Sequence, residues 1–302
     1  MTETLAPPSP TRPLYAGGPE VSSIAWGMWR FSGDDLAAST ARVHAALDAG
    51  VTLFDTADIY GPDNDEPFGA SEALFGRVLS ADPGLKARMV IATKGGIRMG
   101  WPYDSSADYL TSAIDASLQR LGVEQVALWQ IHRPDVLTHP SETARALEDA
   151  HAAGKIGAVG VSNFTTGQVE ALAAHLRLPI VSCQPEFSAV RTHAMTDGVL
   201  DQAIARNMTV LAWSPLAGGR LANPRDDYAN AVAEALDVKA EEAGVSRAVA
   251  AYSWIMAHAA RPIPLVGAQT PSRIAEIAEV WKVRWTRPEW YAVLAASIGP
   301  LP

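Results

Sequence analysis

Eight short apolar runs recur along the chain and constrain its fold more than any other feature of the sequence. Most are continuously apolar instead of alternating, which is typical of parallel strands buried on both faces. The runs are Val21–Trp26, Val51–Asp55, Met89–Lys94, Val126–His132, Ile156–Ser162, Pro179–Gln184, Met208–Ser214 and Ile263–Gly267. They predict eight buried strands.

Segments with helical periodicity separate these runs. They are Leu36–Ala49, Ser71–Leu79, Ala107–Leu121, Glu142–Ala153, Gly167–His175, Gly198–Ala205, Tyr228–Ala243 and Ala248–Ala259, with two more at Pro271–Val280 and Pro288–Ala296. Start signals support several of them, because Asp34-Asp35 precedes the first and two segments resemble capping boxes. Those two are Ser105 to Asp108 and Thr165 to Gln168.

Regular alternation of eight strands with helices predicts a single (β/α)₈ TIM barrel of the α/β class. We expect residues 1–18 to form an N-terminal arm and residues 19–302 to form the barrel domain. The longest interval between strands runs from Ser214 to Ile263, so the seventh βα loop should be expanded. Long loops at this rim usually carry binding.

Charge and composition exclude several classes of function. The net charge of −9 argues against nucleic acid or an anionic membrane as the main partner. The N-terminus has no signal-peptide pattern, and the single cysteine, Cys183, fits a reducing compartment. We therefore expect a cytoplasmic enzyme that acts on a small molecule. A monomer is the default expectation, because no predicted helix has a clear surplus apolar face that could form a dimer interface.

Four polar residues lie at or just after the ends of predicted strands: Asp55, Tyr60, Lys94 and His132. The carboxyl ends of barrel strands share one rim, where such folds keep their active sites. A tyrosine beside a lysine, a carboxylate and a histidine suits proton transfer that requires no metal. His132 also lacks a neighbouring histidine or glutamate at metal-ligand spacing, which makes a metal-dependent barrel enzyme a poor alternative.

These residues lie in segments that resemble the aldo-keto reductase superfamily, in family order. The matching segments are Phe54–Gly61, Lys94, Ile131–Asp135, Gly160–Phe164, Cys183–Glu186, Ala212–Leu216 and Gly267–Pro271. The resemblance implies reversible, NADPH-dependent reduction of aldehyde or ketone carbonyls. In that reading Tyr60 donates the proton, Lys94 lowers its pKa, Asp55 holds Lys94, and His132 orients the carbonyl.

The resemblance also implies a set of cofactor-binding residues for NADPH or NADP⁺. They are Gly27, Met28, Ser162, Asn163, Gln184, Trp213, Ser214, Leu216, Gly218, Arg220, Gly267, Gln269, Arg273 and Glu276. Arg273 matches the arginine that meets the 2′-phosphate, which favours NADPH over NADH. Gln269 departs from the pattern, because family members often have a basic residue there.

Trp29 and Trp101 are the candidate substrate-binding residues. Their apolar walls suggest a carbonyl compound with a hydrophobic or aromatic portion. An alternative function is that of an NADPH-binding regulatory or sensor subunit with little turnover. Reduction of an aldehyde panel by the purified protein would separate these two hypotheses.

Overall fold

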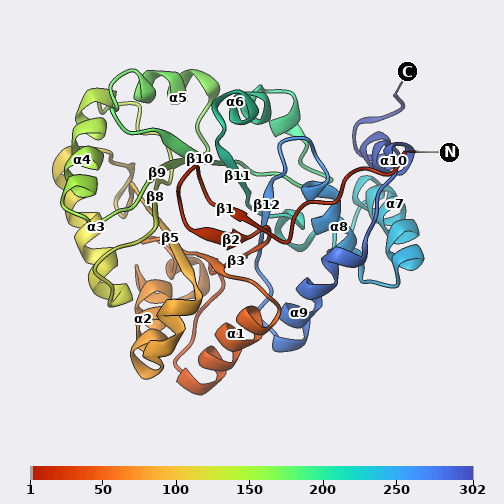
Figure 1. Ribbon diagram of the computed structural model, residues 1–302, viewed down its shortest axis with the longest axis horizontal. Helices are drawn as coiled ribbons and strands as arrows, with labels where there is room; N and C mark the ends of the chain where they lie inside the picture. The colour runs from red at the N-terminus through yellow and green to blue at the C-terminus, as the bar shows by residue number, and fades with distance from the viewer. Residues whose placement is uncertain (1–2, 302) are drawn as a thin grey trace.

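Eight parallel strands close into a barrel in the computed structural model, which describes residues 3–301 (Figure 1). In barrel order they are β3 (Ala25–Gly27), β4 (Leu53–Asp55), β5 (Val90–Gly95), β8 (Leu128–Ile131), β9 (Val159–Ser162), β10 (Ile180–Gln184), β11 (Thr209–Ala212) and β12 (Ile263–Val266). β12 pairs in parallel with β3 and so closes the ring. The predicted (β/α)₈ barrel is confirmed.

Helices surround the barrel as an outer ring (Figure 1). They are α1 (Leu36–Asp48), α2 (Ala70–Ala81), α3 (Ala107–Leu121), α4 (Pro140–Ala152), α5 (Thr166–Ala173), α6 (Val199–Arg206), α7 (Asp227–Ala243), α8 (Arg247–Met256), α9 (Pro271–Ala275) and α10 (Arg287–Ile298). Short 3₁₀ helices are η1 (Pro62–Asn64), η2 (Pro83–Arg88), η3 (His193–Met195), η4 (Ala217–Gly219) and η5 (Glu276–Lys282). The predicted helix Pro271–Val280 is thus an α-helical turn followed by a 3₁₀ segment.

The start signal before the first helix is confirmed, because Asp35 caps α1 by accepting from the Ala38 amide. The two expected capping boxes can also be compared with the structure. The capping box of Thr165 and Gln168 is confirmed, because each side chain bonds the other's backbone N–H. The other prediction was displaced by one residue. Ser106, not Ser105, caps α3 by accepting from the Tyr109 amide. Serine is a preferred N-cap residue at either position, so the sequence alone does not show which of the two serines caps the helix.

A separate apolar cluster fills the inside of the barrel. It consists of Leu14, Val21, Ala25, Leu53, Ala92, Leu128, Ala158, Val181, Leu211, Ile263 and Leu265. The outward faces of the same strands pack against the helices in the larger core. Burial of both faces explains why the strand sequences are continuously apolar.

An antiparallel hairpin, β1 (Thr11–Pro13) with β2 (Glu20–Ser22), lies across one end of the barrel (Figure 1). Thr209, the first residue of β11, donates from its hydroxyl to the Leu14 carbonyl at 2.7 Å, so this is the amino end of the strands. The apolar run Val21–Trp26 therefore spans two strands, β2 and β3, instead of one. The boundary expected after residue 18 falls inside this hairpin, whose first strand is held against the barrel.

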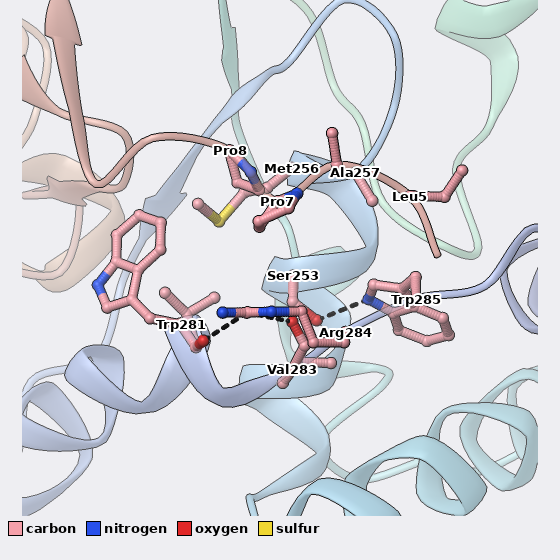
Figure 2. A pocket seen from close by; sticks show the side chains of 12 residues that line it. Leu5, Pro7, Pro8, Ser253, Met256, Ala257, Trp281, Val283, Arg284 and Trp285 are labelled. Carbon is pink, nitrogen blue, oxygen red and sulfur yellow. Dashed lines mark hydrogen bonds between the residues drawn. The ribbon is translucent and has the colours of Figure 1, made fainter. Parts of the chain in front are cut away.

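The chain before the hairpin crosses α8 and η5 (Figure 2). The Leu5 amide donates to the Trp285 carbonyl at 2.8 Å, and the Trp285 indole donates to the Ser253 hydroxyl at 2.9 Å. Pro7 and Pro8 line a cavity of about 20 Å³ at this contact, room for a single water. This cavity is separate from the site described below.

A second hairpin, β6 (Ile97–Arg98) with β7 (Trp101–Tyr103), follows β5 and was not expected from the sequence. The β7 residues are exposed, so the sequence of this strand lacks the apolar pattern that predicts a buried strand. The expanded loop after β11 leads into η4 and then α7, as predicted. Across residues 3–301 no helix has the length and apolar character needed to cross a membrane.

Candidate active site

The four strand-end residues meet at the carboxyl rim of the barrel. The Lys94 ammonium donates to Asp55 Oδ2 at 2.5 Å and to the Thr56 carbonyl at 2.8 Å. It lies 5.0 Å from the centroid of the Tyr60 ring. The Tyr60 and His132 rings meet edge to face, with centroids 5.8 Å apart. Neighbouring strands β4, β5 and β8 bring these groups together.

Asp55 is held from two sides. Its Oδ1 accepts from Gln130 Nε2 at 3.2 Å and from Gln184 Nε2 at 3.0 Å, while its Oδ2 accepts from Lys94. The carboxylate is 1% exposed and the lysine is fully buried. A buried charge is tolerated only when paired and hydrogen-bonded, and here both conditions are met.

Burial and charge act in opposite directions on this pair. Burial alone lowers the pKa of Lys94, but Asp55 and Tyr60 raise it, and the net pKa lies above the ordinary lysine value. For Tyr60, burial raises the pKa and the Lys94 charge offsets this only in part, so the net pKa also lies above its ordinary value. The sequence-based expectation of a lowered tyrosine pKa is therefore not met in this structure. Tyr60 holds its proton at neutral pH.

His132 is neutral at physiological pH. Burial holds its pKa well below the ordinary value, and the charges of Lys94 and Arg133 lower it further. A neutral imidazole can hydrogen-bond a carbonyl oxygen but is a poor competing acid. The His132 side chain therefore suits hydrogen bonding to a substrate oxygen more than proton donation.

Asp58 lies behind these residues and makes no hydrogen bond through either carboxylate oxygen. It is 1% exposed, and its amide donates to the Lys94 carbonyl at 2.9 Å. Burial, with a smaller effect of the nearby Glu72 charge, raises the pKa of Asp58 well above its ordinary value. The folded protein must keep this carboxyl protonated at pH values where an unfolded chain would ionise it.

Asp58→Asn is therefore expected to stabilise the protein increasingly as pH rises above about 4, the ordinary pKa of aspartate. Because the folded pKa is raised, Asp58 contributes stability at low pH that is lost as pH increases toward that folded value. The difference in unfolding free energy grows by at most about 1.4 kcal/mol per pH unit. Chemical denaturation of both proteins at several pH values between 5 and 8 measures it. A difference independent of pH would contradict this account.

A cleft of about 900 Å³ opens at Asp55, Tyr60 and His132. Most residues predicted to bind the cofactor or substrate line it: Gly27, Trp29, Ser162, Asn163, Gln184, Trp213, Ser214, Leu216, Gly218, Gly267, Gln269, Arg273 and Glu276. Asp55, Tyr60 and His132 line the same cleft. One continuous wall therefore joins the catalytic group to the remote Arg273 end.

Three of the predicted residues do not line the cleft. The Met28 side chain is fully buried in the core, and only its amide approaches the site by donating to the Asp55 carbonyl. Arg220 forms a bidentate ion pair with Asp226 at 2.9 Å. Trp101 is 53% exposed on β7, with the Arg98 guanidinium 3.9 Å from its ring centroid. Sequence position alone could not reveal these local partners.

Asn163 connects several residues of the cleft wall. Its Oδ1 accepts from the Trp213 indole at 3.0 Å, and its Nδ2 donates to the Ser162 hydroxyl at 2.8 Å. Ser162 in turn donates to the Gln184 carbonyl at 2.9 Å. Asn163 is thus linked through Ser162 to the Gln184 backbone and fixes the Trp213 ring, while the Gln184 side-chain amide donates to Asp55 and Gln130.

The loop after β11 has an unusual backbone. Ser214 and Ala217 have φ values of 52° and 50°, and Gly218 and Gly219 follow at 68° and 101°. Left-handed conformations cost free energy in residues other than glycine and tend to gather at ligand sites. Successive backbone amides in such turns form concave anion-binding surfaces. This loop has the features of a phosphate-binding segment.

Gln269, which departs from the family pattern, has an arginine neighbour that the sequence did not indicate. Arg42 of α1 donates to Gln269 Oε1 at 3.2 Å and to the Ser39 hydroxyl at 2.9 Å. Its guanidinium also lies 5.0 Å from the Phe31 ring centroid. The cation therefore lies beside Gln269, although it comes from α1, far away in the sequence.

Several charged residues of the cleft were missed by sequence reasoning. They include Arg30, Asp63, Arg133 and Arg247. Two of them directly follow residues that were singled out, because Arg30 follows Trp29 and Arg133 follows His132. Their positions next to strand ends were the available signal.

A family model described as "Aldo/keto reductase family" matches residues 23–297. The chain belongs to the aldo/keto reductase family. A 6-dehydroglucose reductase of Novosphingobium aromaticivorans is 54% identical over 301 residues, 99% of each chain. A protein of the same name from Agrobacterium fabrum is 35% identical over 293 residues, 93% of this chain and 95% of its own.

Among solved structures, a glycerol dehydrogenase of Gluconobacter oxydans superposes with a TM-score of 0.82 at 27% identity. The match covers 99% of this chain and 97% of that one. This aldo/keto reductase is therefore a TIM-barrel oxidoreductase, and its reductase-named relatives support carbonyl reduction.

Proposed function

We propose that this protein uses NADPH to reduce an aldehyde carried on a sugar, with 6-dehydroglucose as the first candidate substrate. The observation that carries the proposal is the meeting of Tyr60, Lys94, Asp55 and His132 beneath one end of a long cleft. The 54% identity to a 6-dehydroglucose reductase supports the substrate. A cytoplasmic location is part of the same proposal.

The residues along the cleft fit the nicotinamide, pyrophosphate and 2′-phosphate groups of NADPH. Trp213 offers a flat ring held by Asn163 near the catalytic end. The strained loop at Gly218 offers backbone donors for a pyrophosphate. At the far end, Arg273 lines the cleft and makes no salt bridge or side-chain hydrogen bond within residues 3–301. A free guanidinium there suits a 2′-phosphate.

When bound, NADPH supplies the hydride; the protein supplies binding, orientation and the proton. Negative charge develops on the carbonyl oxygen during reduction, and Tyr60 Oη protonates that oxygen. The Lys94 charge stabilises the phenolate that remains, and Asp55 holds Lys94 in place. The neutral His132 hydrogen-bonds the oxygen and fixes the carbonyl plane. The reverse reaction uses the same groups.

Arg273→Leu tests the cofactor assignment. Charge-assisted hydrogen bonds contribute about 1.5–3 kcal/mol, so the KM for NADPH should rise about 10- to 100-fold. The KM for NADH, which lacks the 2′-phosphate, should stay within about twofold. Steady-state kinetics with both cofactors measures this, with Arg145→Leu on the exposed face of α4 as the control. Equal losses with both cofactors would contradict a 2′-phosphate contact.

A further inference from the structure

Arg133 lies on the cleft wall beside the catalytic group. It directly follows His132 and is among the residues that line the cleft. Its guanidinium is 5.9 Å from the centroid of the Trp213 ring. Its charge also contributes to the lowered pKa of His132. Arg133 is therefore close to the position of a reacting carbonyl.

The Arg133 guanidinium is unpaired in the part of the chain that the structure describes: it makes no salt bridge and no side-chain hydrogen bond. Other half-buried arginines are paired. Arg120 binds Glu72 at 2.7 Å, and Arg247 binds Asp237 at 2.5 Å. A partly buried guanidinium has five donors that need acceptors, and leaving them unmet costs free energy. A ligand in the cleft can supply those acceptors.

The other walls near the mouth are polar and well fixed. The Trp29 indole donates to Asp63 Oδ2 at 2.9 Å, and Asn64 donates to the Trp29 carbonyl at 2.6 Å. Trp29 is 40% exposed, and the Arg30 guanidinium lies 4.8 Å from its ring centroid. One indole with two guanidinium groups and a carboxylate offers hydrogen bonds that a purely apolar substrate leaves unused.

We propose that Arg133 selects aldehydes that carry adjacent hydroxyl groups, by donating from its planar fork to two neighbouring hydroxyl oxygens. This assignment rests on the proposed function and narrows it to a substrate class. Two parallel donors match a vicinal pair of oxygens in a way that a lysine ammonium cannot. The apolar portion inferred from the tryptophans is replaced by a polyhydroxylated one.

A phosphate or carboxylate on the substrate would also accept from Arg133. The Asp63 carboxylate in the same cleft would repel such an anion, whereas the Arg30 guanidinium would attract it. A neutral hydroxyl pair meets no such penalty. The assignment therefore commits to neutral polyhydroxylated aldehydes.

Three three-carbon aldehydes separate these chemistries: propanal, glyceraldehyde and glyceraldehyde 3-phosphate. The test is the kcat/KM for each aldehyde in wild type, Arg133→Gln and Arg133→Lys at saturating NADPH. Arg145→Gln, at an exposed position of α4, is the control. In Arg133→Gln the value for glyceraldehyde should fall about 10- to 100-fold, as expected for loss of charge-assisted hydrogen bonds. The value for propanal should change less than about threefold. Arg133→Lys should resemble Arg133→Gln.

Equal losses for propanal and glyceraldehyde would overturn the assignment, because Arg133 would then act on the catalytic group itself. A loss confined to the phosphorylated aldehyde, or full rescue by lysine, would also overturn it. Unchanged melting temperature and NADPH Kd in both variants show that the effect concerns the substrate. Wild type that reduces neither 6-dehydroglucose nor any of the three aldehydes would instead refute the proposed function, on which this assignment rests.

Discussion

Tyr60→Phe should lower kcat for aldehyde reduction by about 10²- to 10⁴-fold, the usual contribution of a positioned proton donor. Burial keeps the Tyr60 proton in place at neutral pH, while the ammonium of Lys94 lies 5.0 Å from its ring centroid to stabilise the phenolate. The neighbouring His132 is neutral and is therefore a poor replacement for it as an acid. Single-turnover kinetics with NADPH measures the loss.

Binding separates this effect from damage to the fold. The Kd for NADPH should change less than about threefold, because Tyr60 supplies the proton and the assigned cofactor contacts lie elsewhere along the cleft. Tyr228→Phe is the matched control, since it removes a phenolic hydroxyl at the start of α7 that bonds the Val190 carbonyl and the Ser297 hydroxyl. Its kcat should stay near wild type. Comparable losses in both variants would argue against a specific role for Tyr60.

Lys94→Met should abolish activity and also destabilise the protein by about 3–5 kcal/mol. The substitution leaves Asp55, which is 1% exposed, without its cation at the carboxyl end of β4. Removing one partner of a buried ion pair strands the other charge in a low-dielectric site. The amides of Gln130 and Gln184 still donate to Asp55 and limit the loss. Chemical denaturation at neutral pH measures the change in unfolding free energy.

The double variant Asp55→Asn/Lys94→Met distinguishes stability from catalysis. It removes both charges, so most of the lost stability should return, as when a whole buried pair is replaced by neutral groups. Activity should remain absent, because nothing then stabilises the Tyr60 phenolate. Recovery of turnover together with stability would mean that Lys94 serves the fold alone.

The barrel was predictable because burial on both faces leaves a simple signature in each strand. Six of the eight barrel strands fall within the predicted apolar runs, and β3 and β5 each extend one residue beyond theirs, to Gly27 and Gly95. The run Val21–Trp26 was misread as one strand, since two consecutive buried strands read as a single apolar segment. The β6–β7 hairpin was missed because exposed residues such as Trp101 carry no periodic burial pattern.

The candidate site was predictable where strand geometry alone decides position, and less so where neighbours decide. Asp55, Lys94 and His132 follow from strand ends, which the barrel brings to one rim. The ion pair of Arg220 with Asp226 depends on the path of a loop, which no periodicity encodes. The raised pKa of Tyr60 depends on the extent of burial, which the sequence does not report.

The expected substrate class was likewise hard to predict from the sequence, because it depends on which side chains meet in the cleft. Aromatic residues near the strand ends suggested an apolar substrate, yet the structure places charged side chains such as Arg133 and Asp63 among them. Arg133 comes from a loop and Asp63 from the short 3₁₀ helix η1, and in such segments sequence patterns say little about side-chain direction. Contacts in space, not the residue types, changed the expected substrate class.

Incubation of the purified protein with NADPH and 6-dehydroglucose is the most direct test of the central claim. The absorbance band of the reduced nicotinamide reports cofactor oxidation, and product analysis identifies the sugar formed. We predict that NADPH is consumed in step with the formation of glucose, faster than with NADH, and that Tyr60→Phe loses this turnover. Tight NADPH binding without reduction of this or any other aldehyde would contradict the account and favour a cofactor-sensing protein.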